Sequence, residues 1–292
     1  MARRLDRTGI ALVGLAATFL AGCAALTPMS GQDRYLSDFQ AAQRSGRTFA
    51  PATEVLPNLT LPEAYALQRR LVASEERSGN VVIGFKGGLM SAKSLADRGV
   101  TEPLVGSLFI SGDLSSGAEV SLCGYRRAAF ELKLGYIFRS PVTEKVATVD
   151  DLAALVDSVQ PIAELPDIAY RDDKTYNAVD MAAANISSAR FVRGTARPLG
   201  TIDLDNLRVS LSRDATRVAS GTGRDSLGSQ WESLRTVVNL VIANGGRIAP
   251  GQIVITGKIG AKGDLLPGYY SADYDALGAL NFTVSKCASR PG

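Results

Sequence analysis

Three charged side chains lie inside apolar, strand-like runs and are the first candidates for chemistry. Glu131 and Lys133 are two residues apart in the run 130–138, so in a β-strand both project from one face. Glu164 lies near the end of a second apolar run, 161–165. Buried carboxylates are costly unless a cation or another partner compensates their charge. The pattern therefore predicts a site in which distant carboxylates are brought together around a positive charge.

The same residues also fit a purely structural role. Lys133 can form a buried ion pair with Glu131 or Glu164 and hold two strands in register, because an ammonium group neutralises carboxylates as directly as a metal ion does. The sequence leaves both interpretations open.

Composition excludes several other kinds of site. The 292-residue chain contains no histidine, which rules out His-based triads, His general bases and His metal ligands. Its net charge is only +3 and no basic run is present, so nucleic acid is not an expected partner. A hydrophobic fraction of 46% predicts a globular protein with a sizeable core.

Helix and strand signals alternate irregularly along the chain. Thr60 to Glu63 form a capping box that opens a helix to about Arg77. Thr148 caps a second helix, with Leu152, Leu155, Val156 and Val159 on one face. The other expected elements are helices 91–98, 176–184 and 226–243, strands 81–86, 105–110, 118–122, 189–193, 252–256 and 279–285, and a hairpin 207–219. Many short strands with a few helices indicate an α+β fold.

Lys86 ends the expected strand 81–86 beside Gly87 and Gly88. The two glycines leave room for a ligand to approach the lysine closely. The alternative is a solvated lysine at a strand end.

The spacing around Glu131 and Glu164 also resembles a known family. Glu131-x-Lys133 before an apolar strand, followed about one helix later by Pro161-x-x-Glu164, resembles the metal-ligand pattern of the fumarylacetoacetate hydrolase superfamily, in particular its 2-keto-4-pentenoate hydratase and 4-oxalocrotonate decarboxylase branch. Further motifs at 65–68, 84–89, 185–188, 191–194 and 256–257 resemble those of the family and lie in the same order along the chain.

The resemblance implies a mixed β-roll or sandwich core with a smaller N-terminal α/β part. It also implies a site that binds Mg²⁺ or Mn²⁺ and a small carboxylate or 2-oxo acid. The residues carried over are Lys86, Lys133 and Ser187 as catalytic groups, Glu131 and Glu164 as metal ligands, and Gly87, Asn185, Thr256 and Lys258 as substrate contacts.

Three positions depart from the family pattern. Lys133 replaces the second Glu, Ala184 replaces an Asp, and Lys258 replaces a small hydroxyl residue. Two functions follow. One is a hydratase-like lyase that acts on a short unsaturated 2-oxo or 2-hydroxydienoic acid by metal-assisted enolisation and water addition. The other is a catalytically degenerate protein in which Lys133 replaces the metal and the pocket binds a small carboxylate or is structural.

The N-terminus has the pattern of an export signal. Arg3, Arg4 and Arg7 precede an apolar run, 10–20, that is too short to span a bilayer. Leu20-Ala21-Gly22-Cys23 resembles a bacterial lipobox, in which Cys23 would be acylated. Ala24, in place of an Asp after this cysteine, resembles the pattern of lipoproteins that are sorted to the outer membrane and face the periplasm. A plain secretory signal or a buried N-terminal helix are the alternatives.

The expected organisation is a signal peptide (1–22), a tether with a loosely docked helix (23–59), an N-terminal α/β part (60–100) and a hydratase-like core (101–292). The alternative for 23–59 is that it covers part of the core. Export would place Cys123 and Cys287 in an oxidising compartment, where they can pair, although small buried apolar residues are the simpler interpretation. The oligomeric state stays open and includes a homo-oligomer.

Overall fold

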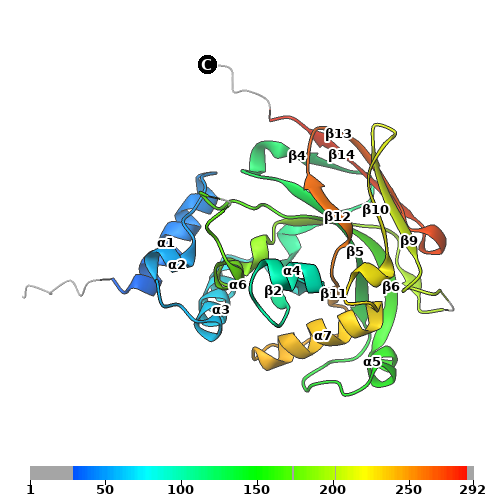
Figure 1. The fold of residues 1–292 in the computed structure, drawn as a ribbon, viewed down its shortest axis with the longest axis horizontal. Helices are drawn as coiled ribbons and strands as arrows, with labels where there is room; N and C mark the ends of the chain where they lie inside the picture. Colours follow the sequence, from blue (N-terminus) through cyan, green and yellow to red (C-terminus); the bar gives the residue numbers. More distant parts are fainter. Residues whose placement is uncertain (1–28, 173, 201, 288–292) are drawn as a thin grey trace, which may run out of the picture.

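Two β-sheets with helices grouped beside and below them make up the structure, a computed structural model that describes residues 29–172, 174–200 and 202–287 (Figure 1). The expected signal peptide and Cys23 lie outside the described residues. Within the described part of the chain, no helix has the length and apolar character needed to cross a membrane.

The larger sheet carries the charged residues singled out above. Its strands run in the order β2 (Leu104–Phe109), β1 (Val82–Gly88), β11 (Ile253–Ile255), β5 (Ala129–Phe138), β6 (Val156–Leu165), β7 (Arg190–Arg193) and β3 (Asp113–Ser115). Two more strands join it, β12 (Ile259–Asp264) against β5 and β8 (Arg197–Pro198) against β6. The boundary expected at residue 100 falls between β1 and β2, which pair antiparallel within this one sheet.

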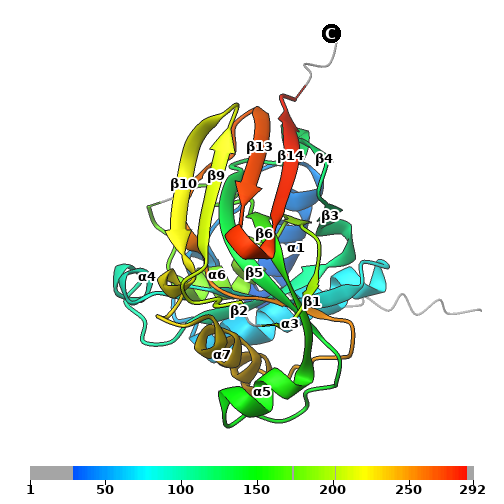
Figure 2. The same ribbon diagram turned by 90° about the vertical axis from the view of Figure 1, so that its right-hand side faces the viewer.

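The smaller sheet packs beside the larger one, and its strands occupy the upper half of the view in Figure 2. Its order is β10 (Thr216–Thr222), β9 (Arg208–Arg213), β13 (Gly268–Asp273), β14 (Ala279–Ser285) and β4 (Ala118–Ser121). Tyr270 of β13 packs on Phe130 of β5 with ring centroids 6.1 Å apart, and the Tyr274 hydroxyl donates to the carbonyl of Ile162. These buried contacts join the two sheets, and the expected mixed sheet core is confirmed.

The helices are α1 (Gly31–Arg44), α2 (Ala52–Val55), α3 (Leu61–Arg77), α4 (Ala92–Asp97), α5 (Val149–Leu155), α6 (Ala178–Ala183) and α7 (Gln230–Ala243). The capping box predicted for α3 is present between Thr60 and Glu63. Helix α1 is not loosely docked as expected. Its Phe39 is buried, and the centroid of the Phe39 ring lies 4.5 Å from that of Phe49. The segment before residue 60 therefore covers part of the core.

The predicted helix through Val159 was wrong in its second half. Helix α5 ends at Leu155, and Val156 begins strand β6. Nearly every residue of β6 is buried, so its apolar side chains do not alternate as they do in a half-exposed strand. In a continuous apolar run, residues at helical spacing are apolar as well, so Val156 and Val159 were assigned to the preceding helix.

Cys123 and Cys287 form a disulfide. Cys123 lies in the short 3₁₀ turn Leu122–Gly124 and Cys287 follows β14, and both residues are exposed. The interpretation of these cysteines as small buried apolar residues was therefore wrong. The bond fixes the end of the last strand beside β4, with which β14 pairs in parallel.

We expect the Cys123→Ser/Cys287→Ser double variant to lose about 3–5 kcal/mol of unfolding free energy, because the bond closes a long loop, with a sequence separation of 164 residues, in the unfolded chain. Urea denaturation followed by circular dichroism measures the loss. Dithiothreitol should destabilise the parent protein by a similar amount and leave the double variant unchanged. Equal stability of parent and variant under oxidising conditions would contradict a structural bond.

Candidate active site

Strand pairing brings the two candidate carboxylates face to face. Strands β5 and β6 are antiparallel, with Glu131 directly opposite Glu164 and Lys133 opposite Ile162. Residues opposite one another project from the same face of a sheet, and so do residues two apart on one strand. All three charged side chains therefore point to one face. Two like charges in directly opposed positions are unfavourable, so this pairing requires a cation.

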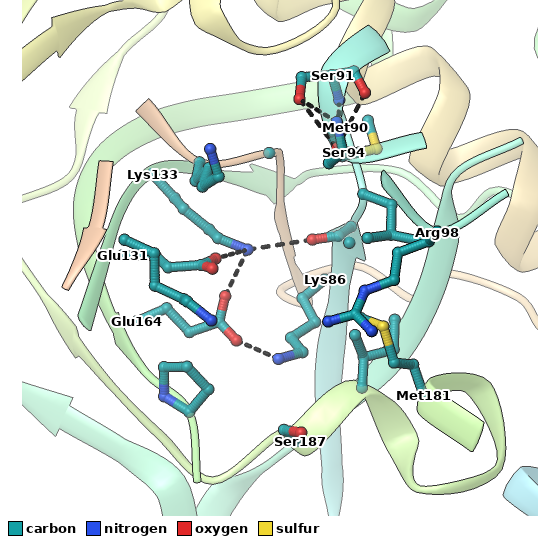
Figure 3. Close-up of a pocket in the computed structure, with 18 of the residues that line it drawn as sticks. Lys86, Met90, Ser91, Ser94, Arg98, Glu131, Lys133, Glu164, Met181 and Ser187 are labelled. Carbon is teal, nitrogen blue, oxygen red and sulfur yellow. Dashed lines mark hydrogen bonds and ion pairs between the residues drawn. The ribbon is translucent and has the colours of Figure 1, made fainter. Parts of the chain in front are cut away.

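Lys133 supplies that cation (Figure 3). Its Nζ lies 3.2 Å from Glu131 Oε2 and 2.5 Å from Glu164 Oε2. It also donates a hydrogen bond to the carbonyl oxygen of Gly87 at 3.1 Å. An ammonium group has three N–H donors, and three acceptor oxygens surround this one.

Lys86 provides a second ammonium group from strand β1. It forms an ion pair with Glu164 Oε1, so each oxygen of Glu164 faces a different lysine. The side chains of Lys86, Lys133 and Glu164 are at most 3% exposed, whereas that of Glu131 is 19% exposed. Two buried cations and two carboxylates thus balance in formal charge, and Glu131 is the member most open to solvent.

The environment shifts the pKa values in different directions. Burial alone would raise the pKa of Glu164, but the ammonium groups of Lys133 and Lys86 lower it to about 2. Burial also opposes the charge of Lys133, but the Glu164 and Glu131 carboxylates outweigh it and raise the pKa of Lys133. Burial, together with the nearby Lys133 charge, lowers the pKa of Lys86 despite its contact with Glu164. Lys86 is therefore the lysine of the cluster that gives up a proton more readily.

The charged cluster lines a cavity of about 330 Å³. Seven of the residues predicted from the sequence line it: Lys86, Gly87, Glu131, Lys133, Glu164, Ser187 and Lys258. The site therefore brings together residues from strands β1, β5 and β6, from the turn after α6, and from the connection between β11 and β12.

Asn185 and Thr256 have other surroundings. The Asn185 side chain binds the backbone of Ser107, accepting from its N–H at 2.7 Å and donating to its carbonyl at 2.9 Å. The Thr256 hydroxyl is buried and lies 2.8 Å from Gln230 Oε1. Their positions do not support the predicted contacts with a ligand in this cavity. Both polar groups instead hold neighbouring parts of the fold together.

Ser187 reaches the cavity through an uncommon backbone turn. Asn185, Ile186 and Ser187 have φ values of 52°, 49° and 53°, in the left-handed region that non-glycine residues rarely adopt. For a β-branched residue such as Ile186 this conformation is costly, and the surrounding structure must stabilise it. The two hydrogen bonds between Asn185 and Ser107 do so at one end of the turn.

Several cavity residues were not found from the sequence. They include Arg98, Lys262, Ser91, Ser94 and Tyr176. Arg98 donates to the carbonyl of Tyr176 at 2.7 Å, and its guanidinium lies 4.2 Å from the centre of that ring. The available signal was the predicted helix 91–98, which comes shortly after the strand that bears Lys86 and which the structure shows as α4. With Arg98 and Lys262 included, five cationic and three anionic side chains line the cavity, so it favours an anionic ligand.

The donor set does not fit a divalent metal ion. Glu131 and Glu164 are the two carboxylates that were expected to ligate Mg²⁺ or Mn²⁺, and the Lys133 ammonium lies between them. Within residues 29–172, 174–200 and 202–287, no cluster of three or more acidic, His or Cys side chains could hold a metal. A hard divalent cation needs several oxygen ligands, which these ammonium groups already occupy.

Comparison with known proteins finds relatives over most of the chain, although no protein-family model matches it. A 4-oxalocrotonate decarboxylase from a Pseudomonas species is 30% identical over 228 residues, covering 78% of this chain and 88% of that protein. A 2-keto-4-pentenoate hydratase from Burkholderia vietnamiensis is 29% identical over 248 residues, covering 84% of this chain and 94% of that protein.

A solved structure shows the same overall architecture. It is a 4-oxalocrotonate decarboxylase from Pseudomonas putida G7 complexed with magnesium and adipate, with a TM-score of 0.82 and 26% identity, covering 86% of this chain and 96% of that one. The same enzyme has also been solved with calcium and acetate, with a TM-score of 0.81.

We expect Lys133→Met to destabilise the fold by about 3–5 kcal/mol, because it leaves two opposed carboxylates in a buried setting without their shared cation. Chemical denaturation measures the loss. The matched control is Lys93→Met, which removes an ammonium group from an exposed pair with Asp97 and should change stability little. Equal effects of the two substitutions would contradict the buried ion cluster.

Proposed function

Because the chain belongs to the family of 4-oxalocrotonate decarboxylases and 2-keto-4-pentenoate hydratases, we propose that it is a hydratase-like lyase acting on a short unsaturated 2-oxo or 2-hydroxydienoic acid. The related structures bind the small carboxylates adipate and acetate. The observation that carries the proposal for this chain is the pair of buried ammonium groups, Lys86 and Lys133, in a cavity with an excess of cationic side chains.

The cluster suits the charge changes of this chemistry. Ketonisation of a 2-hydroxydienoate moves a proton from the hydroxyl oxygen to a carbon atom, and water then adds across the conjugated double bond. Negative charge develops on the C2 oxygen during the proton transfer. Fixed cations in a site shielded from water stabilise such charge strongly. Lys86 and Lys133 are the cations placed for this role.

Glu164 positions the two lysines, whereas Glu131 and Lys86 are the groups suited to exchange protons. Glu164 faces a lysine with each oxygen, so it positions Lys86 and Lys133. Glu131 contacts Lys133 through Oε2 and is the more exposed carboxylate, which leaves it accessible to a proton on the ligand or on water. Lys86, with its lowered pKa, is the second group suited to exchange a proton.

A second candidate function is the binding of a small carboxylate without turnover. It is favoured by the Lys133 ammonium, which lies where the resemblance places a metal ion. In the metal-dependent enzymes of this chemistry, a divalent ion supplies Lewis-acid activation. A single ammonium charge gives weaker polarisation, and binding then becomes the main property of the pocket.

The two functions separate in one set of measurements. We expect the purified protein to consume 2-hydroxypenta-2,4-dienoate, which is measured as a loss of the substrate's ultraviolet absorbance. We expect Lys86→Met to lower kcat by about 100-fold or more. Lys93→Met, outside the cavity, is the control for the substitution itself. Saturable binding of a small carboxylate such as adipate, with no turnover, would select the binding function. Absence of both turnover and binding would contradict both proposals.

We further propose that the protein is exported and anchored by acyl chains on Cys23, at the outer membrane facing the periplasm. The lipobox-like sequence before Cys23 supports this location. The disulfide between Cys123 and Cys287 supports it as well, because such bonds persist in oxidising compartments.

We expect Cys23→Ser to move the protein out of the membrane fraction, because serine at this position cannot carry the acyl chains proposed for Cys23. Stable anchoring needs two or more such chains. Fractionation of cells that produce the parent or the variant measures this, and mass spectrometry of the parent should find an acylated Cys23 as the first residue. An unmodified Cys23 in an intact N-terminus would contradict the anchor.

A further inference from the structure

Lys133 Nζ is held like an ion in a coordination site. Its neighbours are one oxygen each of Glu131, Glu164 and the Gly87 carbonyl, at 3.2, 2.5 and 3.1 Å. These oxygens come from three different strands, β5, β6 and β1. Carboxylate and carbonyl oxygens are also the ligands that hard cations prefer. The fold thus offers an oxygen-lined position for a cation, and a side chain of the chain itself fills it.

The ammonium group has little freedom to leave this position. The Lys133 side chain is 3% exposed, and its departure would leave Glu131 opposite Glu164 with only Lys86 as a buried partner. Two carboxylate oxygens and the Gly87 carbonyl oxygen surround the three N–H donors of Lys133, and this environment favours the charged ammonium form. A divalent ion at the same place would meet a fixed positive charge at very short range.

We propose that Lys133 is the resident cation of this pocket, that it makes the pocket independent of divalent metal ions, and that Lys133→Glu alone turns the cluster into a divalent-cation site. The inference concerns metal binding and holds whether or not the pocket turns over a substrate. It therefore stands or falls separately from the proposed lyase activity.

The geometry favours a new site in the variant. A glutamate at position 133 would project from the same face as Glu131, opposite β6, and its carboxylate oxygens end one bond nearer the backbone than the lysine Nζ does. The position of the ammonium is then vacated and three carboxylates surround it. Mg²⁺ and Mn²⁺ suit such a site, in which water completes the oxygen ligands.

Isothermal titration of the purified full chain with MnCl₂ and MgCl₂ tests the proposal. The parent protein is expected to show no saturable binding up to millimolar concentrations. Lys133→Glu is expected to bind one Mn²⁺ per chain with a dissociation constant at least tenfold below the highest concentration at which the parent shows no saturable binding, and Mn²⁺ should raise its melting temperature. Electron paramagnetic resonance of Mn²⁺ gives a second measure of the bound fraction.

The matched control is Lys258→Glu, which makes the same change of charge in the same cavity without placing a carboxylate between Glu131 and Glu164. It should bind Mn²⁺ no better than the parent. Equal binding by both variants would overturn the proposal, because general cavity charge would then explain the effect. Saturable one-to-one binding of Mn²⁺ by the parent would overturn it too.

Folding of the variant is monitored by circular dichroism, because three carboxylates with only Lys86 as a buried cation destabilise the cluster. Lys133→Gln provides a second test, since its neutral amide offers an oxygen ligand and removes the resident charge. It is expected to bind Mn²⁺ more tightly than the parent and more weakly than a folded Lys133→Glu. A folded Lys133→Gln or Lys133→Glu that binds no Mn²⁺ would overturn the proposal.

Discussion

The pairing of Glu131 with Glu164 across strands β5 and β6 is the constraint on which the site depends. Two carboxylates in this position repel one another in the interior of the larger sheet, and burial increases that cost. Lys133 and Lys86 offset it by contacting separate oxygens of Glu164. Because Lys86 comes from β1, the ion cluster also connects strands that do not pair directly. The register of the sheet therefore determines which charges meet in the pocket, and the ion pairs between these charges stabilise that register.

Much of the fold was predictable from local signals. The capping box at Thr60 located α3, and the hairpin turn at Asp214 and Ala215 was found because strand-like runs flank it. Strands β12 and β13 were missed, since Gly263, Gly268 and several charged residues interrupt their apolar pattern. Their pairing with β5, β9 and β14 stabilises them instead. Long-range contacts of this kind leave no periodic signal in a single sequence.

The charged part of the site was predictable for a simple reason. A spacing of two fixes the common face of Glu131 and Lys133 once the segment is a strand. No comparable rule indicated which way Asn185 and Thr256 would turn, and their polar groups bind Ser107 and Gln230 instead. Arg98 was missed for the opposite reason. Its place at the cavity depends on how helix α4 folds back after β1, and sequence spacing does not describe that path.

The disulfide between Cys123 and Cys287 changes the effect that a protease has on the folded chain. Residues 123–287 form a covalent ring that contains Glu131, Lys133 and Glu164. Cleavage of a single peptide bond within an exposed loop of this ring would not release a fragment, because the bond between Cys123 and Cys287 would still join both pieces. The strands that carry the cluster stay covalently joined after such a cut, whereas the same cut would divide a chain without the disulfide into two pieces.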